Sequence, residues 1–324
     1  MIYTLTINPA VDKLIFLDKF IQNRTNRPIK TAETIGGKGT HVSLNLNLLK
    51  AENRAIVTAS GNTGEKLVQM LHDHGVKTEI ILGEGYETRT NIIIVESTKD
   101  CTIIAEQGSL ITDEMMDEVI KTLWRNLTAR DYLVLSGESG NSKRNIYSEI
   151  IREFSPKGVR IFLDASGATL KESIKEHPFL VKPNLDELSQ LCGIPLDGNN
   201  VEEVIECMKE LDKYSIEVVA VSMGGSGSLI KMGNEIWRAC APNIEVENTI
   251  GCGDSYLSAL VFGFYNNMPL KEIIILATAI SAATAENESS VGFDVNRIDQ
   301  LKALVRIEQI TAPHQISSKA VSLK

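Results

Sequence analysis

Runs of apolar, β-branched residues alternate along the chain with segments whose apolar residues recur at helical spacing. The runs predict buried strands at 2–7, 54–59, 131–135, 159–163, 179–181 and 217–221. The helical segments follow them at 38–50, 63–74, 142–153, 184–191 and 200–213. Strands that are apolar on nearly every residue and separated by helices are typical of a parallel sheet covered on both faces. The pattern therefore predicts an α/β fold whose ligands bind at the carboxyl ends of the strands.

Several short segments have a different, alternating pattern. Those at 13–17, 30–35, 90–95 and 101–105 predict a small separate sheet that forms a lid over the site. The segment at 227–240 predicts antiparallel strands at the far edge of the main sheet. After about residue 306 the pattern is lost, as in a frayed terminus. We therefore expect a single domain over 1–306, with a lid from roughly 13–35 and 88–106, and a poorly ordered tail over 307–324.

Composition narrows the choice of partners. The 324 residues carry a net charge of −9, which argues against nucleic acid and anionic membranes, because both attract basic surfaces. An anionic substrate stays open, since a pocket can be basic inside an acidic protein. The longest apolar stretch, around 273–285, is too short to span a bilayer, and no basic leader of a signal peptide precedes the first strand. Five cysteines without a CxxC pair predict reduced thiols in a cytoplasmic protein.

A candidate anion site lies near the C-terminus. The sequence Gly251-Cys252-Gly253-Asp254 runs straight into a strongly apolar helical segment. The start of a helix offers unpaired N–H groups and a positive dipole end, which suit a phosphoryl group, and glycine lets the backbone approach such an anion closely. Asp254 in the first turn is placed to accept a proton from a hydroxyl. An ordinary helix start with an acidic first turn is the alternative.

Three further motifs occur in order along the chain. They are Asn-Pro-Ala-Val-Asp at 8–12, Gly-Gly-Lys-Gly at 36–39 and Lys-Pro-Asn-Leu-Asp-Glu-Leu at 182–188. Together with Gly-Cys-Gly-Asp-Ser at 251–255, they give the chain a resemblance to the PfkB (ribokinase-like) family of sugar kinases from about residue 6 to 305. The chain is most similar to the branch that phosphorylates ketohexose phosphates, namely 1-phosphofructokinase and tagatose-6-phosphate kinase. No P-loop competes, because 36–40 lacks the Walker pattern.

The resemblance implies a fold, a reaction and a set of ligands. The fold is a ribokinase-like three-layer sandwich with a mostly parallel central sheet and a small β-sheet lid. The ligands are ATP, Mg²⁺ and a sugar phosphate, and several relatives dimerise through the lid sheets, so a homodimer through the lid is expected here. Phosphoryl transfer needs a base for the acceptor hydroxyl and groups that neutralise the transferred oxygens. Asp254 is the expected base, and the N–H groups of Gly251, Cys252, Gly253 and Asp254 the expected anion hole.

The substrate side is expected to combine a sugar-facing turn with phosphate-binding cations. Glycines in the 36–39 turn admit the sugar, a carboxylate accepts hydrogen bonds from a polyol, and a pair of arginines selects a sugar phosphate over a free sugar. Single arginines are more often solvated surface residues, and an aspartate after a proline is often only a turn residue. The expected substrate-binding residues are Asp12, Arg27, Gly37, Lys38, Gly39, His41, Arg89 and Asn91.

The nucleotide side is expected to hold triphosphate and metal. In the resembling family the Asn-x-x-Glu pair, here Asn184 and Glu187, holds Mg²⁺, a hard cation that keeps several of its waters. A capping box with Asn184 as N-cap fits the same spacing, and both interpretations stay open. The expected nucleotide-binding residues are Lys182, Asn184, Ser222, Gly224 and Gly227, and the expected metal ligands are Asn184, Glu187 and Asp164.

The chain departs from the family pattern in four places. His41 stands where the family has a sugar-contacting asparagine, and the loops at 102–109 and 136–141 differ from the usual sequences. These three changes fall on the substrate side. Cys252 replaces the usual alanine between the two glycines; a thiol at a helix start can have a lowered pKa and react with alkylating reagents, although a small buried cysteine fits equally well.

The sequence therefore predicts an ATP- and Mg²⁺-dependent kinase of a ketohexose phosphate. The preferred reaction converts fructose 1-phosphate to fructose 1,6-bisphosphate, and the second choice converts tagatose 6-phosphate to tagatose 1,6-bisphosphate. Two alternatives stay open, namely a kinase of an unphosphorylated sugar or nucleoside, and a catalytically silent sugar-phosphate-binding regulator.

Overall fold

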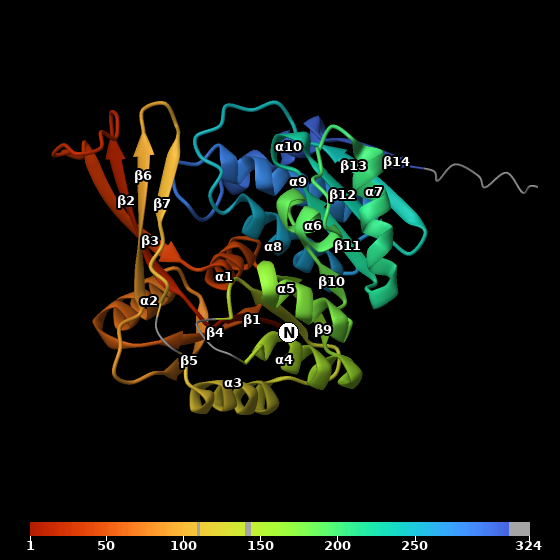
Figure 1. Cartoon of the computed structure of the whole chain (residues 1–324), viewed down its shortest axis with the longest axis horizontal. Helices are drawn as coiled ribbons and strands as arrows, with labels where there is room; N and C mark the ends of the chain where they lie inside the picture. Colours follow the sequence, from red (N-terminus) through yellow and green to blue (C-terminus); the bar gives the residue numbers. More distant parts are fainter. Residues whose placement is uncertain (109–110, 140–143, 311–324) are drawn as a thin grey trace, which may run out of the picture.

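The computed structural model describes residues 1–108, 111–139 and 144–310. A ten-stranded sheet in the order β14-β13-β12-β11-β10-β9-β8-β1-β4-β5 forms the centre (Figure 1). The strands from β11 to β5 are parallel, and β12, β13 and β14 add to the other edge as antiparallel strands. The bounds are β1 Ile2–Thr6, β4 Asn53–Ala59, β5 Lys77–Leu82, β8 Tyr132–Ser136, β9 Arg160–Asp164, β10 Leu180–Val181, β11 Val218–Ser222, β12 Ser228–Met232, β13 Glu235–Cys240 and β14 Arg306–Ile310.

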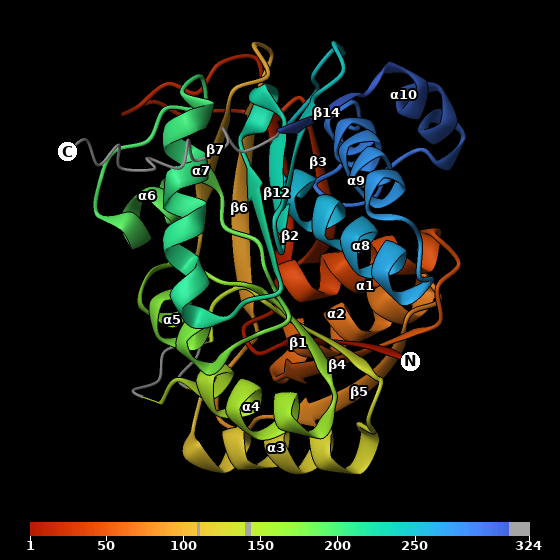
Figure 2. The ribbon, with the colours of Figure 1, turned by 90° about the vertical axis from the view of Figure 1, so that its right-hand side faces the viewer.

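Helices cover both faces of the central sheet. Figure 2 shows α1, α8 and α9 on one side and α5, α6 and α7 on the other, with α3 and α4 at one end. The bounds are α1 Lys38–Leu48, α2 Gly61–Asp73, α3 Asp113–Asn126, α4 Ile146–Phe154, α5 Gly167–Ser173, α6 Leu185–Cys192, α7 Val201–Glu210, α8 Cys252–Tyr265, α9 Leu270–Ala285 and α10 Ile298–Leu304. In the described part of the chain, no helix is both long enough and apolar enough to cross a membrane.

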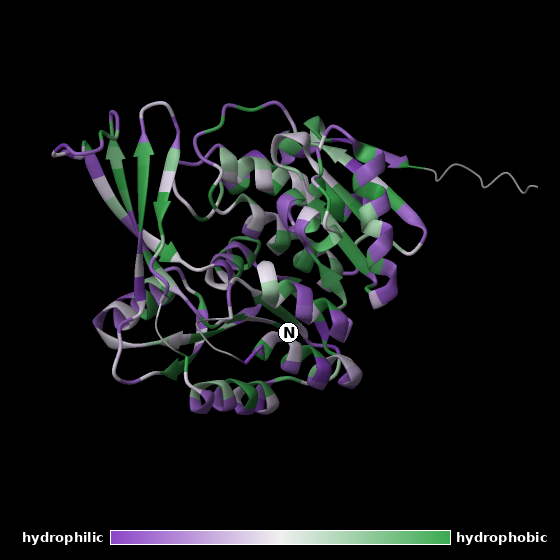
Figure 3. Cartoon of the chain, viewed as in Figure 1, coloured by the Kyte–Doolittle hydropathy of each residue, from purple (hydrophilic) through white to green (hydrophobic). Residues whose placement is uncertain are grey.

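Successive side chains of the central strands belong in turn to two hydrophobic cores, one on each face of the sheet. In β8, Leu133 and Leu135 join the cluster formed with α3, α4 and α7, whereas Tyr132 and Val134 join the cluster formed with α1, α8 and α9. Successive side chains of a strand point to opposite faces, so a strand that is apolar throughout needs cover on both sides. Figure 3 shows the central strands as predominantly hydrophobic, with hydrophilic residues on the outward faces of the helices. The predicted three-layer α/β arrangement is confirmed.

A second, four-stranded sheet stands beside the main body, at the left of Figure 1. Its order is β3-β2-β6-β7, with bounds β2 Ala10–Leu17, β3 Lys30–Gly36, β6 Arg89–Glu96 and β7 Cys101–Ile104. Along the chain, β2 is the next element after β1, and β3 is followed directly by α1. The four segments predicted for the small sheet are therefore strands, and both ends of the β2–β3 hairpin join elements of the main body.

The structure corrects the sequence prediction at the C-terminus. Residues Arg306–Ile310 form β14, which pairs with β13 from Ile236 to Cys240, so the predicted tail cannot begin at 307. The remainder of that tail, residues 311–324, lies outside the described residues. The same holds for Ser109 of the first altered loop and for residues 140 and 141 of the second. Besides β14, the structure contains elements outside the predicted set, namely the strand β5 and the helices α3, α5, α9 and α10.

Candidate active site

A polar cavity of about 190 Å³ opens at the carboxyl ends of the central strands. Its lining comes from the end of β1 and the residues after it, from the end of β8 and the residues after it, from the residues after β9, from the start of α1 and from the lid strand β6. Ligands of open α/β sheets bind at this edge. The lining residues are Thr6, Asn8, Lys38, Arg89, Ser136, Gly137, Glu138 and Ser166.

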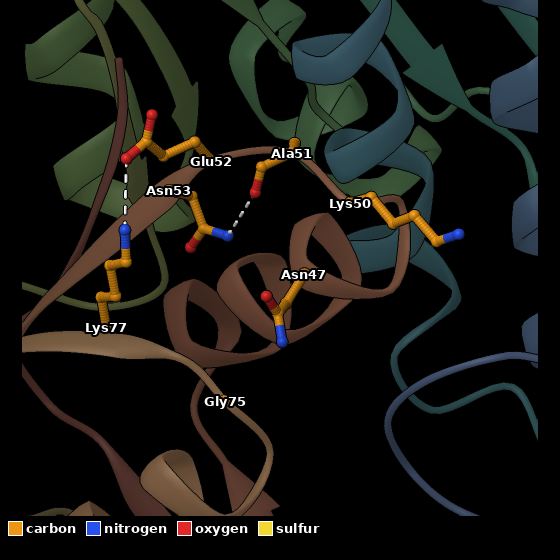
Figure 4. Close-up of a pocket in the computed structure, with 7 residues that line it drawn as sticks. All are labelled: Asn47, Lys50, Ala51, Glu52, Asn53, Gly75 and Lys77. Carbon is orange, nitrogen blue, oxygen red and sulfur yellow. Dashed lines mark hydrogen bonds and ion pairs between the residues drawn. The ribbon is translucent and has the colours of Figure 1, made fainter.

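A second cavity, of about 450 Å³, lies at the opposite edge of the sheet (Figure 4). Asn53 and Lys77, which begin β4 and β5, line it together with residues of the loop after α1. Its charged groups include the ion pair between Lys77 and Glu52, whose Nζ and Oε1 are 3.2 Å apart. The amino ends of parallel strands are not where ligands bind in such sheets, so the first cavity is the candidate site.

The start of α8 has the geometry of an anion site. Gly251 is the N-cap and has a φ of 76°, and a Cβ at this position would lie 2.2 Å from the carbonyl oxygen of Ser290. Only glycine fits here without a shift of the backbone. Ser255 is the residue whose N–H donates to the Gly251 carbonyl, at 2.9 Å. The N–H groups of Gly253 and Asp254 precede this first helical bond, so they begin the helix with their donors facing its N-terminal end.

Asp254 lies buried in the first turn of α8 and contacts a histidine. Its Oδ2 is 2.7 Å from Nδ1 of His41, a buried residue of α1. The other ring nitrogen of His41, Nε2, is 2.9 Å from the carbonyl oxygen of Ile35 at the end of β3. His41 is predicted from the sequence as a sugar contact; in the structure, both of its ring nitrogens lie within hydrogen-bond distance of protein oxygens.

Asp12 is buried in the lid strand β2 close to the start of α1. Asn91 of β6 donates a hydrogen bond from Nδ2 to its Oδ1, at 2.8 Å. A Cβ on Gly36 would lie 2.2 Å from the same Oδ1, so the glycine at this position is what lets the turn pass over the carboxylate. Burial raises the pKa of Asp12, and the neighbouring charges of His41 and Arg89 partly offset this. The structure thus brings together three of the residues predicted for the substrate side: Asp12, His41 and Asn91.

Asp164, at the end of β9, lies between two lysines. Its Oδ1 is 3.3 Å from Nζ of Lys38, and its Oδ2 is 3.3 Å from Nζ of Lys182, which is 4% exposed. Burial would raise the pKa of Asp164, but the two ammonium groups hold it below its usual range. A Cβ on Gly253 would lie 3.5 Å from Nζ of Lys182. This row of contacts links the cavity, which Lys38 lines, to the start of α8.

The two predicted phosphate-binding arginines lie in different surroundings. Arg89 lines the cavity and donates from Nη1 to the Glu106 carbonyl at 2.9 Å and from Nη2 to the Asn8 carbonyl at 3.1 Å. Its Nε is buried and has no acceptor among the described residues. Arg27 is exposed in the loop between β2 and β3 and is not part of the cavity lining. Of the two, only Arg89 is in place to meet a ligand in this structure.

The nucleotide-side residues lie at the ends of β10 and β11. Asn184 and Glu187 form a capping box: the Glu187 N–H donates to Asn184 Oδ1 at 2.7 Å, and the Asn184 N–H donates to Glu187 Oε2 at 2.8 Å. Asn184 also forms a parallel bridge with Ser222, and Gly224 and Gly227 bound the 3₁₀ turn that follows. The capping interpretation is confirmed. It leaves the metal interpretation open, because the cap uses only Oε2 of Glu187, and the second oxygen of that carboxylate can still accept a ligand.

Burial changes what is expected of Cys252. Its side chain is partly buried at the start of α8, and burial together with the charge of Asp254 raises the pKa of the thiol to about 12. Of the two interpretations of Cys252, the structure therefore favours the small buried cysteine over the reactive thiol, because desolvation disfavours the thiolate. All five cysteines are free thiols.

We therefore expect iodoacetamide to leave Cys252 unmodified in the folded protein at pH 8. Only the thiolate reacts, and its fraction at that pH is about one in ten thousand for a pKa of about 12. Peptide mapping after a timed reaction measures this, with Cys240, which is also partly buried but lies away from the start of α8, as an internal reference. Labelling of Cys252 as fast as that of Cys240 would contradict the expectation.

Six of the residues that line the cavity were not predicted as site residues, namely Gly137 and the polar residues Thr6, Asn8, Ser136, Glu138 and Ser166. Each ends or closely follows a strand that is predicted from the sequence, and polar residues at that position are the available signal. Asn8 also opens the first motif, at 8–12. The sequence pattern therefore contains a signal for this set, although nothing in it separates these residues from other polar loop residues.

The chain matches known proteins over nearly its whole length. The family profile described as pfkB family carbohydrate kinase matches residues 5–294. The 1-phosphofructokinase of Borreliella burgdorferi is 31% identical over 312 residues, which cover 96% of this chain and 99% of that protein. The tagatose-6-phosphate kinase of Staphylococcus epidermidis is 30% identical over 313 residues, covering 96% of this chain and 100% of that protein.

A solved structure shows the same fold. Phosphofructokinase-2 from Escherichia coli, determined in complex with substrates and products, aligns with a TM-score of 0.87 and 24% identity over 93% of this chain and 98% of that one. The profile match, the curated relatives and the layered sheet with its small second sheet agree with one another. The chain belongs to the PfkB family of carbohydrate kinases and is a phosphotransferase with the ribokinase-like fold.

Proposed function

We propose that this protein transfers the γ-phosphoryl group of ATP to a hydroxyl of a ketohexose phosphate. Fructose 1-phosphate is the preferred substrate and gives fructose 1,6-bisphosphate; tagatose 6-phosphate is the second choice. The observation that carries the proposal is the row of contacts from the cavity through Lys38, Asp164 and Lys182 to the start of α8. It joins a sugar-sized cavity, which also has Arg89 in its wall, to a helix start and a buried carboxylate. The relatives act on such sugars according to their names.

Asp254 is the proposed base. It takes the proton of the acceptor hydroxyl while the hydroxyl oxygen forms a bond to the γ-phosphorus, and the bond from that phosphorus to the ADP oxygen breaks with its electron pair on ADP. The N–H groups of Gly253 and Asp254 stabilise the charge on the transferred oxygens. Lys182, whose Nζ lies beside Gly253, contributes a positive charge in a buried setting where electrostatic interactions are strong. The small sheet, acting as a lid, excludes water that would otherwise accept the phosphoryl group.

The residues at the start of α6 suit a magnesium ion. Burial and the charge of Asp164 both raise the pKa of Glu187, which means that they disfavour its charged form. A nearby cation would therefore stabilise this carboxylate. Oxygen ligands are those that Mg²⁺ prefers, and Asn184 and Glu187 would hold the ion largely through water. When bound, Mg²⁺ neutralises charge on the phosphate oxygens. The contacts of Asp164 are to two lysines, so its proposed part is to hold these cations near the metal. Lys182, Ser222, Gly224 and Gly227 would contact the nucleotide.

Measuring ADP release with Mg-ATP tests the substrate. The panel is fructose 1-phosphate, tagatose 6-phosphate, fructose 6-phosphate, fructose and ribose. Turnover confined to one ketohexose phosphate is the expected result. Preference for fructose or ribose would favour the kinase of a free sugar, with a nucleoside acceptor as the next test. Ligand binding without ADP release on any sugar would favour the silent regulator.

Arg89 is the proposed selector for the phosphate of the substrate. Replacing it in Arg89→Ala is expected to lower kcat/KM for the sugar phosphate about 10- to 100-fold, because a hydrogen bond to a charged group contributes about 1.5–3 kcal/mol. The KM for ATP should stay unchanged. Arg152→Ala is the matched control, because Arg152 pairs with Glu176 on the surface. An unchanged kcat/KM in Arg89→Ala would remove this residue from the substrate site.

The lid is also the proposed dimer interface. Ile103 and Ile104 of β7 are 52% and 53% exposed, and Ile29 before β3 is 71% exposed. These side chains lie on or next to the two edge strands of the small sheet, β7 and β3, and exposed apolar side chains at a sheet edge favour association with another chain. Sedimentation velocity tests this: a dimer is expected for the full chain, and Ile103→Lys with Ile104→Lys should yield the monomer. A monomeric wild-type protein at micromolar concentration would contradict it.

A further inference from the structure

The ring of His41 has an unusual set of neighbours. It is 4% exposed, and each of its two nitrogens faces an oxygen: the Ile35 carbonyl at 2.9 Å and Asp254 Oδ2 at 2.7 Å. A carbonyl oxygen can only accept, so Nε2 carries a proton. A neutral ring protonated at Nε2 would then direct the lone pair of Nδ1 at the Asp254 carboxylate. The short contact between Nδ1 and Oδ2 therefore requires a second proton, on the ring or on the carboxyl group.

The charges around the ring favour the doubly protonated form. Burial lowers the pKa of His41, but the hydrogen bond and the charge of Asp254, the charge of Asp12 and the Ile35 carbonyl together raise it above its ordinary value of 6.5. Asp254 comes from α8 and Asp12 from β2, so two acidic groups on different elements face one imidazole. Asp12 is in turn bound by Asn91 and lies near Arg89. The ring therefore has two anionic neighbours and a carbonyl, all of which stabilise an imidazolium.

We infer that His41 is a positioning residue, an imidazolium that holds Asp254 Oδ2 so that Oδ1 meets the acceptor hydroxyl. The inference rests on the proposed role of Asp254 as base. In the transfer step the hydroxyl proton goes to Asp254 Oδ1, and His41 keeps both of its ring protons. His41 therefore acts on the rate through the carboxylate. This differs from a sugar contact, which the resemblance implies for the asparagine at this position, because both ring nitrogens are already engaged.

Nitrogen-15 NMR of the histidine rings tests the protonation state without any sugar substrate. The chain has five histidines, and the signal that is lost in His41→Asn identifies His41. At pH 7.5 an ordinary histidine is mostly neutral, because its pKa is about 6.5. The His41 ring is expected to stay doubly protonated at this pH, and its titration should move to lower pH in Asp254→Asn. A singly protonated His41 ring at pH 7.5 would overturn the inference.

Kinetics then separate positioning from sugar binding. His41→Leu removes the donor to Asp254 and is expected to lower kcat about 10- to 100-fold, with the sugar KM changed less than about threefold. His41→Asn keeps a donor without a titrating group. The kcat of the wild type should therefore fall as the pH rises through the raised pKa of His41, whereas that of His41→Asn should not. His72→Asn, on the exposed face of α2, is the matched control.

A raised sugar KM at unchanged kcat would place His41 on the sugar and overturn the inference. An identical alkaline fall in the wild type and in His41→Asn would do the same. Thermal melting of each variant shows that it folds. Should none of the sugars be phosphorylated, the proposed function fails while the NMR result still decides the state of His41.

Discussion

Replacing Asp254 by asparagine is expected to abolish nearly all phosphoryl transfer while the protein still folds and binds ATP. The loss in kcat should be about 10²- to 10⁴-fold, the usual contribution of a general base. The side chain is buried in the first turn of α8, and asparagine has the same size, so the helix start should persist. The amide of asparagine cannot take the proton of the hydroxyl. Steady-state ADP release at saturating sugar phosphate measures the loss.

Two controls make this result specific to the base. Asp299→Asn changes an exposed carboxylate on α10 that pairs with Lys302, and it should leave kcat unchanged. Titration calorimetry with ATP should give the same affinity for Asp254→Asn as for the wild type. Turnover of Asp254→Asn within tenfold of the wild type would remove Asp254 from the role of base.

The second large effect is expected on stability, at Asp164. Asp164→Asn removes the anion that lies between Lys38 and Lys182, and Lys182 would stay buried without its counter-charge. Breaking a buried ion pair by removing one partner costs about 3–5 kcal/mol. Urea denaturation at pH 7 should therefore show a large loss in the free energy of unfolding. Turnover should fall as well, because Lys182 loses its fixed position beside the start of α8 and Lys38 its fixed position in the wall of the cavity.

The pH dependence of this loss has a definite sign. The lysines hold the pKa of Asp164 below its ordinary value of 3.8, so its charge stabilises the fold above that pH and the stabilisation is lost as the pH falls through the folded pKa. The wild type and Asp164→Asn should thus differ fully at pH 7 and progressively less below about pH 4. Equal stability of the two proteins at pH 7 would contradict the buried-pair interpretation.

Much of the fold is predictable from the sequence, because most central strands are apolar throughout. The strand β8, with five buried residues, is the clearest case. In contrast, β5 begins with Lys77-Thr78-Glu79 and is mostly half-exposed at the sheet edge, so its pattern is weak. The strand β14 has no fully buried residue; its ladder with β13 holds it, together with the partly buried Ile307 and Ile310, which pack against the two cores. The position of such edge strands depends on pairing with a strand that is distant in the sequence. The local pattern of apolar and polar residues therefore does not predict them.

The candidate site divides in the same way. The motifs indicate the residue types and the strand ends that bear them. In the structure, Lys38 and Arg89 line the cavity, and Lys182 contacts Asp164, which also contacts Lys38. The contacts that these groups make with one another cannot be predicted from the sequence. His41 and Asp254 are 213 positions apart in the sequence, and nothing in their spacing reveals that they touch. The same is true of Lys38 with Asp164, which meet only because β9 ends opposite the start of α1.

Phosphorus NMR of the complete reaction tests the central claim most directly. The full chain is incubated with Mg-ATP and fructose 1-phosphate, and the phosphorus signals are followed over time. We expect a new phosphomonoester signal of fructose 1,6-bisphosphate that grows in equal amount with ADP, and no such signal with Asp254→Asn. Growth of inorganic phosphate together with ADP, or a bisphosphate that forms equally fast with Asp254→Asn, would contradict the account.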